Sequence, residues 1–361
     1  MIKKIGVLTG GGDCPGLNAV LRAVVKTAVC RYKCEVIGFR DGFRGLVVND
    51  FVRLKPSNVS GILVRGGTIL GSSNRDNPFN FKIERDGQTS HADLSDQVIK
   101  HVAKHAVECM VVIGGDGTLG IARDLIAKGI QVIGVPKTID NDLCATDTTF
   151  GFMTAVNTAT DAIDKLHTTA ESHHRIMILE VMGRYAGWIA LESGIAGGAD
   201  VILIPEIPYD IKKVAQKISD RKNNGKSFSI IVVAEGAKPI GGEMVVGRVV
   251  KDSPDPVRLG GIGNFVAEQL QCLTCMETRV TVLGHVQRGG SPTPYDRILS
   301  TRYGVAAVEL ALKGKFGIMV SLQGDNITAV PIEEAIGKLK NVPPAGQLVR
   351  VAKNIGIEFG E

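Results

Sequence analysis

Glycines and acidic residues follow two apolar runs in this chain of 361 residues. The run Val111–Ile113 leads into Gly114–Thr118, which contains Asp116 and precedes a helical pattern. Glycine lets backbone N–H groups approach an anion closely, and a helix start adds partial positive charge. Asp116 suits Mg²⁺, which prefers one or two carboxylates together with phosphate oxygens. The segment therefore predicts a phosphate-binding turn with magnesium, although glycine turns also serve purely structural purposes.

A second apolar run, Gln131–Val135, leads into Pro136–Asp142. Asp140 and Asp142 lie two residues apart there, so one carboxylate can act as a base while the other holds a metal or a loop. Asn and Asp also favour turns, so a purely structural role is possible for this segment. Because strand ends gather at one crevice in open α/β sheets, the two acidic strand ends together favour a functional site.

Further glycine-rich segments carry cations. The strand pattern at residues 5–9 leads into Gly10–Gly16, and Arg65–Arg75 combines glycines and hydroxyls with a terminal arginine that could reach a phosphate. In Gly284–Pro292, His285 and Arg288 lie among glycines. The planar fork of arginine matches phosphate oxygens, so this last segment suits a phosphomonoester.

Several patterns resemble sites that we do not expect. The spacing after the first strand is not G-x-G-x-x-G, which disfavours a nicotinamide site. Asn224–Ser227 offers the G-K-S of a P-loop, but Asp220 replaces the first glycine and a helix precedes it instead of a strand. His101 and His105 lie four apart without a third ligand, so we expect solvated surface residues. Cys272 and Cys275 form an incomplete zinc motif.

The elements that must position these residues alternate between strand and helix from end to end. Apolar runs at residues 5–9, 35–40, 111–113 and 131–135 are separated by helical patterns, and a second alternation begins near residue 175. This order predicts α/β architecture with a second α/β unit. We expect residues 76–92 to form an exposed polar loop, and the tail after residue 322 to be helical and basic.

Composition excludes several classes of protein. The net charge is +5 with no Lys/Arg-rich block, which disfavours a nucleic-acid partner. No apolar run reaches the length of a membrane span, and the N-terminus runs into a strand pattern without a signal peptide. The seven scattered cysteines predict reduced thiols in a cytoplasmic protein.

Taken together, the segments resemble the 6-phosphofructokinase family, in its ATP-dependent bacterial type. The resemblance covers about residues 1–312 and rests on Leu8–Gly16, Gly114–Thr118, Pro136–Asp142, Glu180–Arg184 and Gly284–Pro292. It implies two Rossmann-like three-layer α/β domains with an active-site cleft between them. Residues 1–151 and about 287–337 would bind the phosphoryl donor, and residues 152–286 and about 338–361 would bind fructose 6-phosphate. It also implies a homo-oligomer, usually a tetramer, whose substrate sites are shared across an interface.

The resemblance assigns roles residue by residue in the transfer of a phosphoryl group to the 1-hydroxyl of fructose 6-phosphate. Asp140 would accept the hydroxyl proton and Asp116 would hold Mg²⁺; Arg175 and Arg279 would reach the 6-phosphate from the neighbouring subunit. The implied catalytic residues are Gly12, Thr138, Asp140, Asp142 and Arg184. The implied donor-binding residues are Gly12, Arg75, Gly115, Asp116, Gly117 and Thr118. The implied substrate-binding residues are Thr138, Asp140, Arg175, Met182, Gly183, Arg184, Glu235, Arg279, His285 and Arg288.

Two positions give opposite indications of which phosphoryl donor the protein uses. ATP-using members typically have glycine at the position of Gly117, where pyrophosphate-using members have an aspartate that would repel the α-phosphate. Lys137 points the other way, because pyrophosphate-using members carry lysine there. An acidic side chain excludes a nucleotide more strictly than a flexible cation favours pyrophosphate, so we expect ATP, with the pyrophosphate-dependent enzyme as the alternative.

Departures from the family pattern concern the donor contact and regulation. Many ATP-using members place arginine at Asn74, whereas the nearest arginine here is Arg75. At the bacterial effector site, Arg22, Lys26 and Lys226 match in charge but His167, Asn224 and Ser227 do not, so allosteric control is expected with an unspecified effector. A noncatalytic regulatory subunit is disfavoured because the acids and Arg184 are intact. Diacylglycerol and NAD kinases share the G-G-D-G turn but lack the segment Gly284–Pro292.

Overall fold

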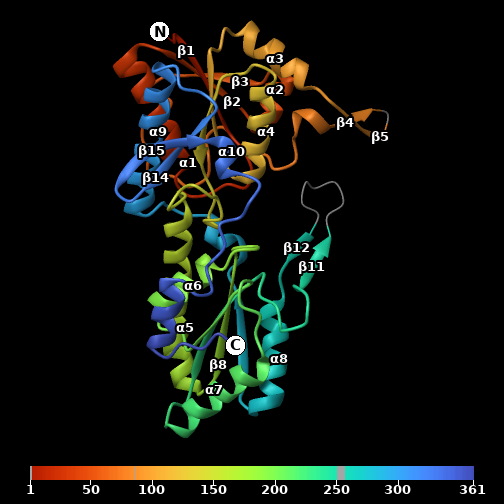
Figure 1. Cartoon of the computed structure of the whole chain (residues 1–361), viewed down its shortest axis with the longest axis vertical. Coiled ribbons are helices and arrows are strands. Elements are labelled where there is room, and N and C mark those ends of the chain that lie inside the picture. Colours follow the sequence, from red (N-terminus) through yellow and green to blue (C-terminus); the bar gives the residue numbers. More distant parts are fainter. Residues whose placement is uncertain (1, 86, 250–256) are drawn as a thin grey trace. The chain divides into compact units, whose positions relative to one another are not determined.

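The chain forms two units in this computed structural model, which describes residues 2–85, 87–249 and 257–361. The first unit comprises Met1–Thr138, Leu143–Gly151 and Arg288–Leu339. The second comprises Ile139–Asp142, Phe152–Gln287 and Lys340–Glu361. Each unit is an α/β structure around a largely or wholly parallel sheet (Figure 1), which confirms the predicted fold class.

A seven-stranded sheet forms the centre of the first unit, in the order β15-β14-β7-β6-β1-β2-β3. Its strands are β1 (Lys4–Thr9), β2 (Glu35–Phe39), β3 (Phe51–Leu54), β6 (Cys109–Gly114), β7 (Val132–Pro136), β14 (Ile318–Gln323) and β15 (Asn326–Pro331). The five inner strands are parallel, and the edge strands β3 and β15 pair antiparallel with their neighbours.

Helices cover both faces of this sheet. One face packs against α2 (Phe43–Val48), α3 (Ser95–Lys104), α4 (Asp116–Ala127) and α10 (Ile332–Ala335), through a buried cluster that includes Leu8 and Val112. On the other side lie α1 (Leu17–Lys26), which continues as a π-helical turn (Thr27–Arg31), and α9 (Pro294–Leu312), which packs on α1 and β7. Strands buried on both faces explain the unbroken apolar runs in the sequence.

The second unit contains a four-stranded parallel sheet in the order β13-β8-β10-β9. Its strands are β8 (Ile176–Val181), β9 (Val201–Leu203), β10 (Ser229–Ala234) and β13 (Thr278–Val282). Helices α7 (Ile211–Asn223) and α8 (Ile262–Thr274) bury Val214 and Val266 against it. Helices α5 (Phe152–His173) and α6 (Trp188–Ala196) also pack on the sheet, and α11 (Gln347–Asn354) packs on α6. A hairpin of β11 (Val246–Val249) and β12 (Val257–Leu259) projects from this unit (Figure 1).

Three local predictions are wrong. Residues 76–92 are not a loop, because a short 3₁₀ turn (Pro78–Asn80) is followed by the antiparallel hairpin β4 (Phe81–Arg85) and β5 (Gln88–Ala92). Phe81 is buried and Ile83 packs against the same core, so alternating apolar residues were the missed signal. The tail is not wholly helical, because β15 continues the sheet. The histidines of α3 are also not solvated.

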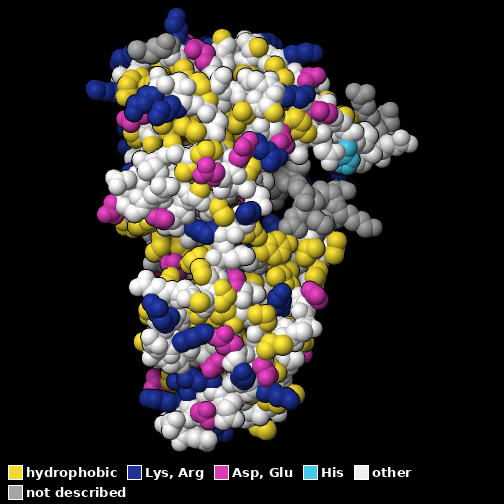
Figure 2. All heavy atoms as spheres, viewed as in Figure 1, with side chains coloured by type: hydrophobic (Ala, Val, Ile, Leu, Met, Phe, Trp, Pro, Cys, Tyr) yellow, Lys and Arg dark blue, Asp and Glu magenta, His cyan; other side chains and the backbone are white. Residues whose placement is uncertain are grey.

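Those two histidines fasten α3 to α2 and to Asn49, which directly follows α2. His101 Nδ1 lies 2.8 Å from the Leu46 carbonyl, and His105 Nε2 lies 2.7 Å from Asn49 Oδ1. The His105 ring also packs on Phe51, with centroids 4.2 Å apart. Their four-residue spacing therefore serves packing. All seven cysteines are free thiols, and no helix among the described residues is long and apolar enough to cross a membrane. Lys and Arg side chains are interspersed with Asp and Glu on the face seen in Figure 2.

The second unit contains a carboxyl group with a perturbed pKa in α6. Burial raises the pKa of Glu192 to about 6, while the positive charge of Lys340 opposes the rise. A carboxyl whose folded pKa is raised binds protons more tightly when folded. Its contribution to stability is therefore fully present below the unfolded pKa and is lost as pH rises through about 6.

Glu192→Gln should therefore stabilise the protein at pH 8 and leave it unchanged near pH 4.5. A shift of this size corresponds to roughly 1–2 kcal/mol, or a melting temperature higher by about 3 °C at pH 8. Thermal melts of the variant and the wild type at the two pH values measure this. An exposed Glu268→Gln variant on α8 is the matched control, and equal gains at both pH values would contradict the assignment.

Candidate functional site

Three turns follow neighbouring parallel strands of the first unit. We name them the β1 turn (Gly10–Gly16), the β6 turn (Gly114–Thr118) and the β7 turn (Lys137–Asp142). The Gly10 N–H donates to the Ile113 carbonyl at 2.9 Å, and the Lys137 N–H donates to the Gly114 carbonyl at 3.0 Å. The carboxyl ends of β7, β6 and β1 thus bring the predicted donor-binding turns to one sheet edge. Only the start of the β7 turn, Lys137 and Thr138, belongs to this unit.

Thr118 is buried between two of these turns. A Cβ added to Gly10 would lie 2.6 Å from Thr118 Cγ2, and one added to Gly114 would lie 2.3 Å from Thr118 Cβ. Both separations are shorter than any van der Waals contact, so neither position has room for a side chain. Thr118, which we predict to bind the donor, also packs the β1 and β6 turns together through its side chain.

Lys137 directs its ammonium group at the β1 turn. The side chain is 4% exposed, and Nζ donates to the Gly12 carbonyl at 2.5 Å. On the same turn, Arg288 Nη1 donates to the Asp13 carbonyl at 3.2 Å and would lie 2.8 Å from a Cβ added to Gly12. Two cations therefore flank the backbone that the sequence assigned to a phosphoryl group. Arg288 lies in the first unit, whereas His285, its predicted partner, lies in the second.

Asp116 and Gly117 begin α4. The Asp116 Oδ1 accepts the Gly337 N–H at 2.9 Å, which orients the carboxylate from the far end of the unit's sequence. A Cβ added to Gly117 would meet no atom within 4 Å, so the space beside it is open. Within the described ranges, no cluster of three or more His, Cys, Asp or Glu residues could hold a metal. One oxygen ligand at a helix start fits Mg²⁺ that arrives with phosphate oxygens and water.

Two serines that we did not predict hold the β1 turn. The Ser72 hydroxyl donates to the Gly11 carbonyl at 2.6 Å, and the Gly11 N–H donates to the Ser73 carbonyl at 2.9 Å. The sequence pointed to this glycine and hydroxyl segment, but its role was assigned to Arg75. The Arg75 side chain is exposed, as is Asn74. The glycine and hydroxyl pattern was therefore the signal that could have pointed to the serines, and the donor contact of Arg75 stays a prediction.

In the second unit, β8 and β10 place Met182–Arg184 beside Glu235. The Arg184 N–H donates to Glu235 Oε1 at 3.0 Å, and Arg184 has a left-handed φ of +53°. The Met182 N–H donates to Gln287 Oε1 at 2.8 Å. Gln287 is fully buried, and its Nε2 has no hydrogen-bond partner among the residues that the structure describes. Gln287 thus joins Met182 to the 3₁₀ turn Gly284–Arg288, which carries the exposed His285.

The acidic end of the β7 turn belongs to the second unit. Asp140 and Asn141 are buried there, and Asn141 has a left-handed φ of +52°. The Lys340 N–H donates to the Asp142 carbonyl at 2.8 Å, and Lys340 Nζ donates to Asn141 Oδ1 at 2.9 Å. Lys340 could not be found from the sequence because its position, 199 residues beyond Asn141, carries no local motif.

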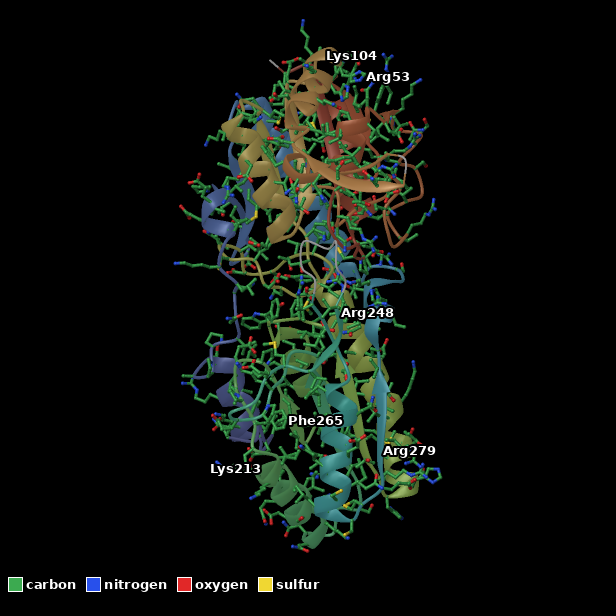
Figure 3. The ribbon with its side chains drawn as sticks, turned by 90° about the vertical axis from the view of Figure 1, so that its right-hand side faces the viewer. Arg53, Lys104, Lys213, Arg248, Phe265 and Arg279 are labelled. Atoms are coloured by element: carbon green, nitrogen blue, oxygen red, sulfur yellow. The ribbon has the colours of Figure 1, made fainter. Side chains whose placement is uncertain are left out.

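Arg175 and Arg279 lie at the other end of the second sheet. Arg175 precedes β8 and Arg279 belongs to the start of β13, where Figure 3 shows its side chain pointing away from the ribbon. Both pair with Glu277: Arg175 Nε lies 2.5 Å from its Oε2, and Arg279 Nη2 contacts its Oε1. Hydrogen bonding, first from Arg175, lowers the pKa of Glu277. Because β8 is six residues long, about 20 Å separates these arginines from Met182–Arg184.

Comparison with known proteins gives a consistent result. The family described as phosphofructokinase matches residues 4–311. The chain is 62% identical to ATP-dependent 6-phosphofructokinase 2 of Clostridium perfringens, over 100% of this chain and 99% of that protein. It is 52% identical to pyrophosphate–fructose 6-phosphate 1-phosphotransferase of Amycolatopsis methanolica, over 94% of this chain and 96% of that protein.

A solved structure supports the fold. The crystal structure of a pyrophosphate-dependent phosphofructokinase from Nitrosospira multiformis superimposes with a TM-score of 0.81. The match covers 99% of this chain and 93% of that one, at 22% identity. At this identity the likeness concerns the architecture of the chain alone.

The glycines of the β6 turn yield a paired prediction. Gly114→Ala should lower the free energy of unfolding by about 1–3 kcal/mol, because its Cβ would overlap Thr118. Gly117→Ala, three residues later in open space, should change it by less than about 1 kcal/mol, and in the stabilising direction. Urea unfolding measures both, and Thr118→Ser should partly restore Gly114→Ala. Equal effects of the two alanines would refute the packing role of Thr118.

Proposed function

The chain belongs to the phosphofructokinase family, and on that premise we propose that it transfers the terminal phosphoryl group of ATP to the 1-hydroxyl of fructose 6-phosphate in glycolysis. The products are fructose 1,6-bisphosphate and ADP. The observation that carries the proposal is the gathering of the β1 turn, the β6 turn and the start of the β7 turn at the carboxyl ends of neighbouring strands, with Lys137 on the β1 turn. The full-length likeness to an ATP-dependent 6-phosphofructokinase supports it.

The first unit supplies the donor-binding groups in this proposal. The backbone of Gly11, which Ser72 and Ser73 fix, and that of Gly12 face the phosphates, and Lys137 contributes positive charge beside them. Gly117 leaves the start of α4 accessible to the donor. Phosphoryl transfer requires alignment and charge neutralisation more than covalent help, and these groups provide both.

Mg²⁺ would be held by Asp116 together with donor phosphate oxygens. Bound there, it would neutralise charge on the donor phosphates. Gly337 keeps the carboxylate oriented by its hydrogen bond to Oδ1.

Most of the proposed acceptor-binding groups belong to the second unit, whereas Thr138 and Arg288 belong to the first. Asp140 accepts the proton of the 1-hydroxyl, and its burial limits competing solvation of the carboxylate. Asp142 and Thr138 flank it in the β7 turn. Arg184 stabilises the transferring group, and Met182, Gly183 and Glu235 contact the sugar. His285 and Arg288 bind its 6-phosphate.

Arg175 and Arg279 complete a site on a neighbouring subunit. Their end of β8 lies about 20 Å from Met182–Arg184, and an arginine side chain extends about 7 Å, so they cannot reach the sugar held by their own chain. The two arginines are predicted to bind the 6-phosphate but are too far from the sugar site of their own chain. In a homo-oligomer they can instead reach the 6-phosphate bound by the partner subunit. A tetramer is the form we propose.

Control by an effector is a further element of the proposal. Lys226 lines a cavity of about 480 Å³ together with His174, Lys222 and Ser227, a set that suits a small anion. His167, one of the positions that departs from the family pattern, is used structurally, because its Nε2 lies 2.7 Å from the Gly197 carbonyl. The effector is therefore expected to differ from the one bound by family members that keep the full set of basic residues at the bacterial effector site.

ATP is favoured over pyrophosphate because the space beside Gly117 is open and Lys137 is anchored. The Lys137 ammonium donates a hydrogen bond to the Gly12 carbonyl, which fixes its position. Lys137 therefore does not need to occupy the space beside Gly117, where the nucleotide would bind. Pyrophosphate remains the second candidate, since a relative that uses it is 52% identical.

The first test measures fructose 1,6-bisphosphate formation from fructose 6-phosphate with Mg²⁺ and either ATP or pyrophosphate, in parallel. We expect turnover with ATP. In Gly117→Asp, ATP-dependent kcat/KM should fall by about 100-fold or more, because a carboxylate would face the α-phosphate. The matched neutral variant Gly117→Asn separates bulk from charge. Turnover with pyrophosphate alone, or full ATP use by Gly117→Asp, would refute the donor assignment.

A hybrid experiment tests the shared sites. Asp140→Asn should reduce kcat by about 10²- to 10⁴-fold, and Arg279→Ser should weaken fructose 6-phosphate binding across the interface. Oligomers reassembled from an equal mixture of the two variants should recover activity. In them, the site of an Arg279→Ser chain keeps its own Asp140 and receives Arg279 from its partner. No recovery, with mixed oligomers verified by mass, would contradict shared sites.

A further inference from the structure

The chain segment Lys340–Val342 returns to the second unit and lies on the β7 turn. Lys340 contacts the turn twice: its N–H donates to the Asp142 carbonyl at 2.8 Å, and its Nζ donates to Asn141 Oδ1 at 2.9 Å. One residue thus binds both the backbone and a side chain of the turn, directly beyond Asp140.

The same segment is anchored to the start of α6. The Trp188 Nε1–H donates to the Lys340 carbonyl at 2.7 Å, and the Trp188 ring lies under the ammonium, with Nζ 5.7 Å from its centroid. Glu206 Oε1 accepts both the Gly187 N–H at 3.0 Å and the Val342 N–H at 2.8 Å. These partly buried contacts therefore fix Lys340 and its segment against the start of α6.

The turn needs such support because of its backbone. Asn141 adopts a left-handed conformation, which asparagine tolerates better than most residues with a Cβ and which surrounding contacts help to determine. Its side-chain oxygen is the group that Lys340 holds. Releasing this oxygen would let Asn141 sample other conformations, and Asp140 would move with it because the two residues share a peptide bond.

We propose that Lys340 is a positioning residue that holds Asn141, and through it Asp140, in the geometry for proton acceptance. The proposal rests on the proposed function for the role of Asp140, but the contact between Lys340 and the turn can be tested without turnover. Lys340 does not touch the reacting atoms. Its effect is expected in kcat more than in the binding of fructose 6-phosphate, whose phosphate is bound by other segments.

Lys340→Met is the sharpest variant. It removes the ammonium but keeps the aliphatic stem and both backbone hydrogen bonds, so the segment stays in place. We expect kcat to fall by about tenfold, since small misplacements of a reacting group are costly, with the KM for fructose 6-phosphate within about twofold of wild type. Hydrogen–deuterium exchange of the peptide covering residues 139–143 should accelerate by about five- to tenfold, because a hydrogen bond to a charged group is lost.

Lys217→Met is the matched control. Lys217 Nζ donates to the Gly356 carbonyl at 2.7 Å and so ties α7 to the C-terminal segment of the second unit. Like Lys340→Met, this variant removes a lysine hydrogen bond to a distant part of the chain, but not one to the β7 turn. It should leave kcat and the exchange of residues 139–143 unchanged. Lys340→Arg, which keeps a charged donor, should recover part of the loss.

The outcomes separate this inference from the proposed function. Unchanged exchange at residues 139–143 in Lys340→Met overturns it, as does faster exchange with an unchanged kcat, or an equal effect of Lys217→Met. If the wild type itself forms no fructose 1,6-bisphosphate with either donor, the proposed function fails. The exchange comparison then still decides whether Lys340 holds the turn.

Discussion

The segment Pro136–Asp142 is divided between the two units and is held by contacts in each of them. On the first unit, the Lys137 N–H bonds to the Gly114 carbonyl and the Thr149 hydroxyl donates to the Thr138 carbonyl at 2.8 Å. On the second, Lys340 binds Asn141 and Asp142. The boundary falls between Thr138 and Ile139, inside the motif to which the chemistry is assigned. The function of this short segment therefore depends on the packing of both units, and on chain segments that return from distant parts of the sequence.

Close approach of backbone explains why the first unit concentrates glycine at its strand ends. Gly10 and Gly114 both contact Thr118 at distances that exclude a Cβ, whereas Gly117 faces open space. Glycines in the β1 and β6 turns thus have different causes: Gly10 and Gly114 are required by the protein's own packing, and Gly117 leaves open space. Sequence alone does not separate these cases, because each position shows only the same residue type.

The sequence was sufficient for the architecture and for the main motifs, because buried parallel strands and glycine turns have strong local patterns. It was insufficient for Lys340, Gln287, Ser72 and Ser73, whose roles arise from contacts with residues far along the chain. The sequence also led us to predict that His101 and His105 are solvated, although both form hydrogen bonds with residues about 55 positions earlier in the chain. Local periodicity shows which face is apolar, but not which polar groups will find partners on a neighbouring element.

In this family, relatives with very similar sequences are named for different phosphoryl donors. Relatives named for ATP and for pyrophosphate lie at 62% and 52% identity to this chain, with nearly complete coverage. High overall similarity is therefore compatible with either donor, and we infer that a few side chains near the phosphates discriminate between them. In the proposed site, Lys137 carries charge that would suit both donors, because both would present phosphates to the β1 turn. Gly117 would differ, since only a nucleotide would need the space beside it. An attractive group shared by two ligands cannot separate them, whereas a space that one ligand must occupy can.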